Sequence, residues 1–179
     1  PATTDADIAR LAEAQGYLDP ACVMHEPFRQ WVIERFDGPR PAWEQAGAQI
    51  VADVAPFETM KLRCLNGTHS ALAYLGYLAG HETIAEAVAD APFAALCRAL
   101  WDREILPTVA RPEGEDLAAY TAALLTRYRN PAIRHRTWQI AMDGSQKLPQ
   151  RILGTVADNL AAGRPVPGLA LAVAGWMRY

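Results

Sequence analysis

Residues 58–80, ETMKLRCLNGTHSALAYLGYLAG, decide the fold, because most of this stretch has the composition of a buried helix. Its apolar side chains recur at helical intervals, and Gly80 supplies a stop signal. Three polar groups nevertheless stand in its first half: Lys61, Asn66 and His69. A lysine, an amide and an imidazole at spacings of five and three therefore need a reason other than packing.

Helical patterns continue on both sides of this stretch. The first predicted helix covers residues 5–16, with Thr4 or Asp5 as its cap and Gly16 at its end. Residues 20–50 have near-alternating Val and Ile broken by proline, and they predict short strands or extended segments. Further helices are predicted from Thr83 to a break or kink at Pro107, and over residues 115–130, 131–144, 145–163 and 167–179.

Composition is that of one globular domain. With 179 residues, half of them hydrophobic, the chain can bury a real core. No linker or repeat divides it, so we expect one mainly α domain over residues 1–179. The formal charge of −3 excludes the basic footprint of nucleic-acid binding. No apolar run approaches the roughly 18 residues of a membrane span, and the opening residues lack a signal-peptide pattern.

The cysteines are odd in number and far apart, at Cys22, Cys64 and Cys97. Apolar neighbours surround each of them. This arrangement favours free thiols in a reducing cytoplasm over a disulfide framework.

The three polar groups of the central helix share one of its sides. At about 100° per residue, Asn66 lies about 140° around the helix from Lys61, and His69 lies between them at about 80°. Burial of the apolar remainder would therefore carry all three groups toward an interior cleft. A buried polar group without a partner costs several kcal/mol, so such groups are either paired or functional.

The chemistry of the trio suits the oxidation of an alcohol. A desolvated lysine favours its neutral form, which accepts a proton, while an amide and an imidazole orient hydroxyl or carbonyl oxygens. An alternative stays open on spacing alone: Lys61 is solvated, and neighbouring backbone satisfies Asn66 and His69.

The motif MKLRCLNGTHS, residues 60–70, closely resembles the signature of the long-chain mannitol dehydrogenase family. The segments EPFRQWVIERF, RPAWEQAGAQIV, RYRNPAIRHRTWQIAMDGSQKLPQRI and GRPVPGLALAVAGWMRY resemble the same family in the same order. The resemblance implies a C-terminal, mainly helical substrate domain of the 6-phosphogluconate dehydrogenase C-terminal type. It also implies a separate N-terminal Rossmann domain that binds NAD or NADP, so that this chain alone is expected not to turn over substrate.

The resemblance also implies roles for single residues of the central helix. Lys61 would be the general acid or base, and Asn66 would bind the reacting oxygen. His69 would hold a neighbouring hydroxyl, and Glu58 would pass the proton between Lys61 and solvent.

Substrate binding would involve Lys147, Gln139 and Arg136. Gln139 stands where some family members have arginine, which leaves the substrate open. If Arg134 or Arg136 faces the cleft, a carboxylate can be held, which favours a mannonate–fructuronate type of pair. If both face solvent, a neutral polyol such as mannitol is favoured.

Cofactor and metal expectations follow the same resemblance. The chain has no G-x-G-x-x-G, and its four histidines have no ligand spacing. We expect an NAD- or NADP-dependent, metal-independent, cytoplasmic dehydrogenase of a sugar alcohol or sugar acid, whose partner is its own nucleotide-binding domain, with no nucleic acid or membrane. The alternative is a non-catalytic helical interaction or regulatory domain. Separation of the trio in space would favour that alternative.

Overall fold

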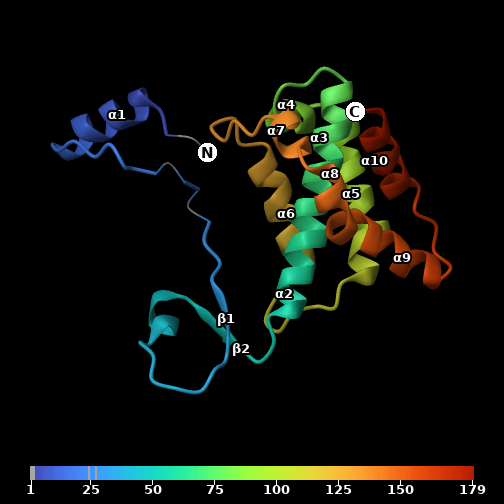
Figure 1. Cartoon of the computed structure of the whole chain (residues 1–179), viewed down its shortest axis with the longest axis horizontal. Helices are drawn as coiled ribbons and strands as arrows, with labels where there is room; N and C mark the ends of the chain where they lie inside the picture. Colours follow the sequence, from blue (N-terminus) through green and yellow to red (C-terminus); the bar gives the residue numbers. More distant parts are fainter. Residues whose placement is uncertain (1–2, 24, 27) are drawn as a thin grey trace.

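The computed structural model describes residues 3–23, 25–26 and 28–179. From residue 55 onward the helices pack into one bundle, and the preceding residues run beside it as a segment that carries a helix and a small sheet (Figure 1). In the described part of the chain no helix is long and apolar enough to cross a membrane. The prediction of a mainly α fold is confirmed.

The first helix, α1 (Asp5–Gln15), begins and ends where the sequence predicts. The Thr4 side chain accepts a hydrogen bond from the backbone of Asp7, and the Asp7 side chain accepts one from the backbone of Thr4. Gly16 ends the helix in the left-handed region, with φ of 77°, which glycine adopts without a steric cost.

The extended region predicted within residues 20–50 contains two short strands. Strand β1 (Val32–Glu34) pairs in parallel with β2 (Gln49–Val51), so that Ile33 lies opposite Ile50. The 3₁₀ turn η1 (Trp43–Ala46) lies between them. This small sheet lies at the lower left of Figure 1, and Val32 and Val51 pack against the core of the bundle.

The central helix is continuous but not uniform. It consists of α2 (Ala55–Met60), the π-helical segment η2 (Lys61–Gly67) and α3 (Thr68–Leu78). Leu72 and Tyr74 are almost completely buried. Helices α7 and α10 both pack against α3, so the core of the bundle is built around it.

The long helix predicted from Thr83 is interrupted. It consists of α4 (Ile84–Ala89), α5 (Ala91–Ala99), the π segment η3 (Leu100–Ile105) and the 3₁₀ turn η4 (Leu106–Thr108). Asp90, with ψ of 123°, separates the first two. The physical reason is Pro92, which cannot donate to the preceding turn and instead stands in the first turn of α5.

Helix α6 (Leu117–Tyr128) is confirmed, with Asp116 as its cap. The helix predicted to begin at Pro131 is wrong, because α7 covers only Thr137–Ala141. Residues 135–137 instead pair with residues 82–84. The backbone N–H of Ile84 donates to the His135 carbonyl at 3.0 Å, and the N–H of Thr137 donates to the Glu82 carbonyl at 2.9 Å. Tertiary pairing thus overrides the helical pattern here.

The C-terminal part agrees with the prediction. It contains α8 (Gly144–Leu148), the π segment η5 (Pro149–Leu153), α9 (Gly154–Ala161) and α10 (Pro167–Arg178). The thiols of Cys64 and Cys97 are free and buried, whereas Cys22 is free but only half-buried.

Candidate functional site

An open cavity of about 1210 Å³ lies between α1 and the bundle. Its walls come from the start of α1, from the η2–α3 junction, from the 132–140 region and from α8 and η5. The side chains of the bundle that line it include Asn66, His69, Arg134, Arg136, Gln139, Lys147 and Arg151. Elements far apart in the sequence therefore meet at one polar cavity.

The π-helical turn η2 changes the geometry of the predicted trio. In a turn closed by i→i+5 hydrogen bonds, residues five apart are neighbours on one face. Lys61 and Asn66 are the first and sixth residues of this segment. The α-helical separation of about 140° between them is therefore wrong, and the π turn brings them closer in angle than an α-helix would. A single widened turn of this kind is frequent at functional sites.

Asn66 and His69 have polar atoms that the protein leaves unsatisfied. Asn66 Oδ1 and His69 Nε2 are both buried and have no hydrogen-bond partner in the described part of the chain. Both residues line the cavity. Because nearly all buried polar groups in proteins are hydrogen-bonded, such exceptions indicate a strained or functional position.

The imidazole of His69 is held between two rings. Its centroid lies 5.3 Å from that of Tyr128, in a stacked arrangement, and 5.3 Å from that of His135. Burial lowers the pKa of His69 to about 3, and the nearby His135 and Arg151 add to the effect. His69 is therefore neutral near pH 7, so it offers a hydrogen bond and not a charge.

Lys61 and Glu58 occupy a different environment. Both side chains are exposed, and neither lines the cavity. Their spacing of three places them side by side on the helix. The expectation that burial carries the whole trio into an interior cleft thus holds for Asn66 and His69 but is wrong for Lys61, whose exposed side chain is not desolvated.

The residues predicted to bind the far end of a substrate come together. Lys147, Gln139 and Arg136 all line the cavity, although they belong to different elements. The Lys147 Nζ donates to the Met142 carbonyl at 2.6 Å. The Arg136 guanidinium lies 3.7 Å from a carboxylate oxygen of Glu82, outside hydrogen-bond distance.

The cavity is electropositive in a chain of net negative charge. Its lining includes five cationic side chains and one carboxylate: Arg10, Arg134, Arg136, Lys147 and Arg151 against Asp7. Asp7 already forms an ion pair with Arg10 at 2.8 Å. The remaining lining groups therefore present an excess of positive charge to any ligand.

Sequence reasoning missed Arg151. It lies four residues after Lys147, one helical turn away, and this spacing was the signal that could have found it. A Cβ on Gly67 would lie 2.6 Å from the Arg151 carbonyl oxygen, so only glycine lets η2 and η5 approach this closely. Gly67 thereby places Arg151 beside Asn66 and His69.

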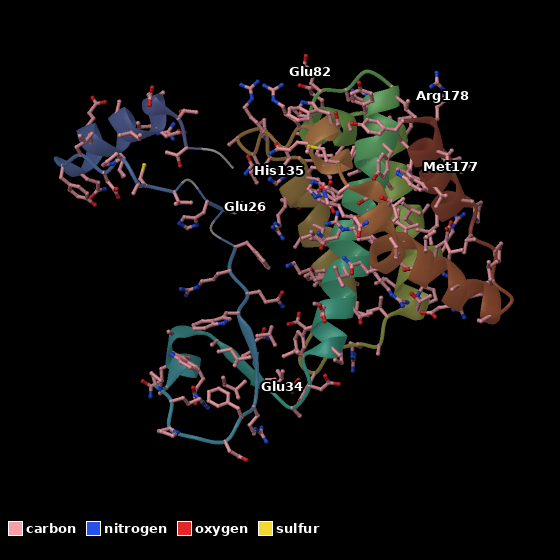
Figure 2. The ribbon with its side chains drawn as sticks, in the orientation of Figure 1. Glu26, Glu34, Glu82, His135, Met177 and Arg178 are labelled. Atoms are coloured by element: carbon pink, nitrogen blue, oxygen red, sulfur yellow. The ribbon has the colours of Figure 1, made fainter. Side chains whose placement is uncertain are left out.

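A second, smaller pocket lies next to His69, and the N-terminal segment reaches it. Arg127 donates from Nε and Nη2 to the two carboxylate oxygens of Glu26, at 3.0 and 2.8 Å. The Arg127 guanidinium also lies 4.4 Å from the centre of the Phe28 ring. Figure 2 shows Glu26 on this segment at the edge of the bundle, near His135. The segment is thus attached to the bundle beside the site.

The fold and the cavity define the class of protein: a mainly helical domain with an open, polar cavity. A family model described as the mannitol dehydrogenase C-terminal domain matches residues 53–179. The chain belongs to this family. The resemblance inferred from the sequence is thereby confirmed.

Relatives and solved structures agree with the assignment. D-mannonate oxidoreductase of Escherichia coli K12 is 56% identical over 100% of this chain and 37% of its own length. Mannitol dehydrogenase 2 of Saccharomyces cerevisiae is 42% identical over 100% of this chain and 36% of its own length.

The structure of Pseudomonas fluorescens mannitol 2-dehydrogenase in a ternary complex with NAD and D-mannitol matches with a TM-score of 0.87 and 40% identity, over 98% of this chain and 36% of that one. A substrate-free D-sorbitol dehydrogenase matches with a TM-score of 0.93 and 30% identity, over 99% of this chain and 37% of that one. The chain therefore spans little more than a third of the length of these relatives.

Proposed function

We propose that this chain is the substrate domain of an NAD- or NADP-dependent dehydrogenase that interconverts a polyol or hexonate with its ketose or ketouronate. The observation that carries the proposal is the pair of buried, unsatisfied atoms, Asn66 Oδ1 and His69 Nε2, at one polar cavity. The hydroxyls of a sugar derivative supply the hydrogen-bond partners that these atoms lack. A relative bound to NAD and D-mannitol supports the same class of ligand.

Lys61 is the acid–base group in this proposal. Lys61 does not line the cavity, but the π turn η2 places it on the same side of the helix as Asn66. In this proposal it removes the proton of a hydroxyl bound at Asn66 during oxidation and returns it during reduction. Because Lys61 is exposed and Glu58 stands one turn before it, the proton has a direct route to solvent. The nicotinamide cofactor, held mainly by a separate nucleotide-binding domain, supplies the hydride acceptor. No metal takes part, so a chelator is expected to leave turnover unchanged.

Asn66 and His69 orient the substrate. The amide nitrogen of Asn66 donates to the reacting oxygen as negative charge develops on it, and its Oδ1 accepts from a substrate hydroxyl. The neutral His69 binds a neighbouring hydroxyl through Nε2. In this way the two residues fix which carbon faces the hydride acceptor.

The charge of the cavity favours a sugar acid over a neutral polyol. Arg134 and Arg136 both line it, whereas Gln139 contributes no charge. A guanidinium binds a carboxylate through two parallel hydrogen bonds, which an amide cannot do. The higher identity to D-mannonate oxidoreductase than to the mannitol dehydrogenases points the same way. We therefore propose a mannonate–fructuronate type of pair, with mannitol–fructose as the second candidate.

The N-terminal segment offers a surface on which the nucleotide-binding domain can dock. Large apolar side chains are exposed on it, namely those of Tyr17, Leu18, Val23, Phe28, Trp31 and Phe36. Exposed apolar side chains that gather along one segment are typical of interaction surfaces. We assign this surface to the nucleotide-binding domain of the same enzyme, and expect residues 1–179 alone to be inactive.

The test is a substrate screen of the full-length parent enzyme. Fructuronate and fructose are compared as substrates with NADH and with NADPH, and kcat/KM is measured for each pair. We expect fructuronate to be preferred. Equal or better use of fructose would reject the sugar-acid assignment, and no turnover of any polyol, ketose or hexuronate would reject the enzyme assignment in favour of an interaction domain.

A further inference from the structure

We propose that Arg151 is a specificity-determining residue that binds the carboxylate of a sugar-acid substrate inside the cavity. The inference rests on the proposed function and deepens it. It names one side chain as the counter-charge of the substrate.

The first observation is the position of Arg151. It lies in η5 and lines the cavity with Asn66 and His69. Its backbone is in contact with η2, because Gly67 has no side chain at the point where a Cβ would lie 2.6 Å from the Arg151 carbonyl oxygen. The two π segments thus pack closely against each other. This packing positions the backbone of Arg151 next to the candidate reacting groups.

The second observation is that Arg151 has no counter-charge. Its Nη1 donates to Ser70 Oγ at 3.2 Å, and its Nε is buried with no hydrogen-bond partner in the described part of the chain. No carboxylate of the described residues lies within ion-pair distance of it. A guanidinium has five donor hydrogens, so most of its hydrogen-bonding capacity is unused by the protein.

The other cations around the cavity differ in this respect. Lys147 lies 3.6 Å from Asp143 and Arg136 lies 3.7 Å from Glu82, so both have an acidic neighbour. Arg134 is exposed, and water can satisfy it. Arg151 alone among these four combines partial burial with the absence of an acidic neighbour in the described structure.

A half-buried and uncompensated cation is costly unless an anion reaches it. The planar guanidinium fork matches a carboxylate, which accepts two parallel hydrogen bonds, whereas a neutral hydroxyl leaves the charge uncompensated. Ser70 holds one nitrogen of the fork and so fixes its orientation. The geometry therefore assigns the substrate carboxylate to Arg151, with the sugar hydroxyls left to the surrounding polar groups.

The test compares charged and neutral substrates in the full-length enzyme. Arg151→Gln is expected to lower kcat/KM for fructuronate by about tenfold or more, mainly through KM, because a charge-assisted hydrogen bond is lost. Fructose, which has no carboxylate, is expected to change by less than about threefold on the same grounds. Arg151→Lys keeps the positive charge but not the planar guanidinium fork. Its kcat/KM for fructuronate is expected to lie between those of the wild type and Arg151→Gln.

Arg98→Gln is the matched control, because Arg98 is exposed at the end of α5, outside the cavity. An equal loss for both substrates in Arg151→Gln would assign Arg151 a structural role and overturn the proposal. An unchanged preference for fructuronate over fructose in Arg151→Gln would overturn the proposal as well. Loss of that preference in Arg134→Gln would then assign the substrate carboxylate to Arg134.

Calorimetric binding of mannonate and mannitol separates this inference from the proposed function. If the parent enzyme turns over no hexonate but binds mannonate in an Arg151-dependent manner, the inference stands and the proposed reaction fails. If hexonate is oxidised and its binding does not depend on Arg151, the reaction stands and the inference fails.

Discussion

His69 is a histidine that the fold keeps uncharged. Its ring lies between Tyr128 and His135, and burial lowers its pKa to about 3, well below the ordinary value of 6.5. A general acid near pH 7 needs a pKa close to that pH, which His69 does not have. Its contribution to a reaction is therefore orientation, and its contribution to stability depends on pH.

We expect acid to weaken the fold through this residue. Because the folded pKa lies below the unfolded one, the unfolded chain binds more protons, and the free energy of unfolding falls as pH decreases from about 6.5 toward about 3. His69→Gln removes this contribution, so its unfolding free energy should fall less between pH 7 and pH 4.5. Urea unfolding of both proteins at the two pH values measures the difference. Identical pH slopes would contradict a buried, neutral His69.

Lys61 is expected to dominate the rate in the full-length enzyme. Lys61→Ala should lower kcat by about a hundredfold or more, as for a positioned acid–base group. An added primary amine should restore part of the activity if proton transfer is the role. Steady-state kinetics with and without the amine are the measurement. Near-normal turnover in Lys61→Ala would remove this residue from the mechanism.

Asn66 is expected to act on the transition state. Asn66→Ala should cost about 3 kcal/mol in kcat/KM, by analogy with other oxyanion donors. The loss should appear in kcat, whereas His69→Ala should act more on KM. A pure KM effect in Asn66→Ala would assign the amide to ground-state binding instead.

At the level of elements, the packing of η2 against η5 links the central helix to the segment that carries Arg151. Helix ends with side-chain caps were predictable, as at Thr4 and Asp116, because capping depends on local residues. The π turns were not, since apolar periodicity has nearly the same appearance with one residue added to a turn. The spacing of polar residues in the central helix predicts Asn66 and His69 as site residues, and the structure places both at the cavity. The spacing of four from Lys147 points to Arg151, but the close approach of Arg151 to η2 depends on a tertiary contact at Gly67 that the local sequence does not encode.

Gly67→Ala tests this contact. The added methyl group meets the Arg151 carbonyl, so the variant should lose about 1–3 kcal/mol of stability by overpacking. Gly154→Ala is the matched control, because its nearest atom, the Pro149 carbonyl oxygen, lies at an ordinary 3.5 Å. That variant should be neutral or gain up to about 1 kcal/mol of helix propensity. Chemical denaturation measures both, and equal stabilities would show that η2 and η5 are free to move apart.

At the scale of the whole molecule, the N-terminal segment joins the bundle through the Glu26–Arg127 ion pair beside the site. Hydrogen bonds from Arg127 lower the pKa of Glu26, so the pair contributes stability above the ordinary carboxyl pKa and loses it as pH falls. The segment has further contacts with the rest of the chain, because Gln30 and Gln49 donate to Glu115, and Val32 and Val51 pack against the core. A single substitution at Glu26 should therefore affect only the part of the segment beside the site.

Glu26→Gln should loosen the part of the segment beside the site without unfolding the bundle. Amide hydrogen exchange over residues 28–36 should become faster, while exchange in α3 should stay unchanged because the core is intact. Glu13→Gln, an exposed position of α1, serves as the control. Unchanged exchange over residues 28–36 in Glu26→Gln would mean that other contacts hold the segment.

Helix α7 is only five residues long and carries Gln139 at the rim of the cavity, between the irregular residues 131–136 and a left-handed turn at Asp143. Asn66 and His69 stand on a different element, the long helix at the centre of the core. Gln139 at the rim and the proposed reaction groups thus stand on separate elements, so that one can be substituted without the other. A chimera that exchanges residues 131–143 for those of a relative should change the affinity for the part of the substrate that contacts Arg134, Arg136 and Gln139, while the preference for a carboxylate stays with Arg151 in η5.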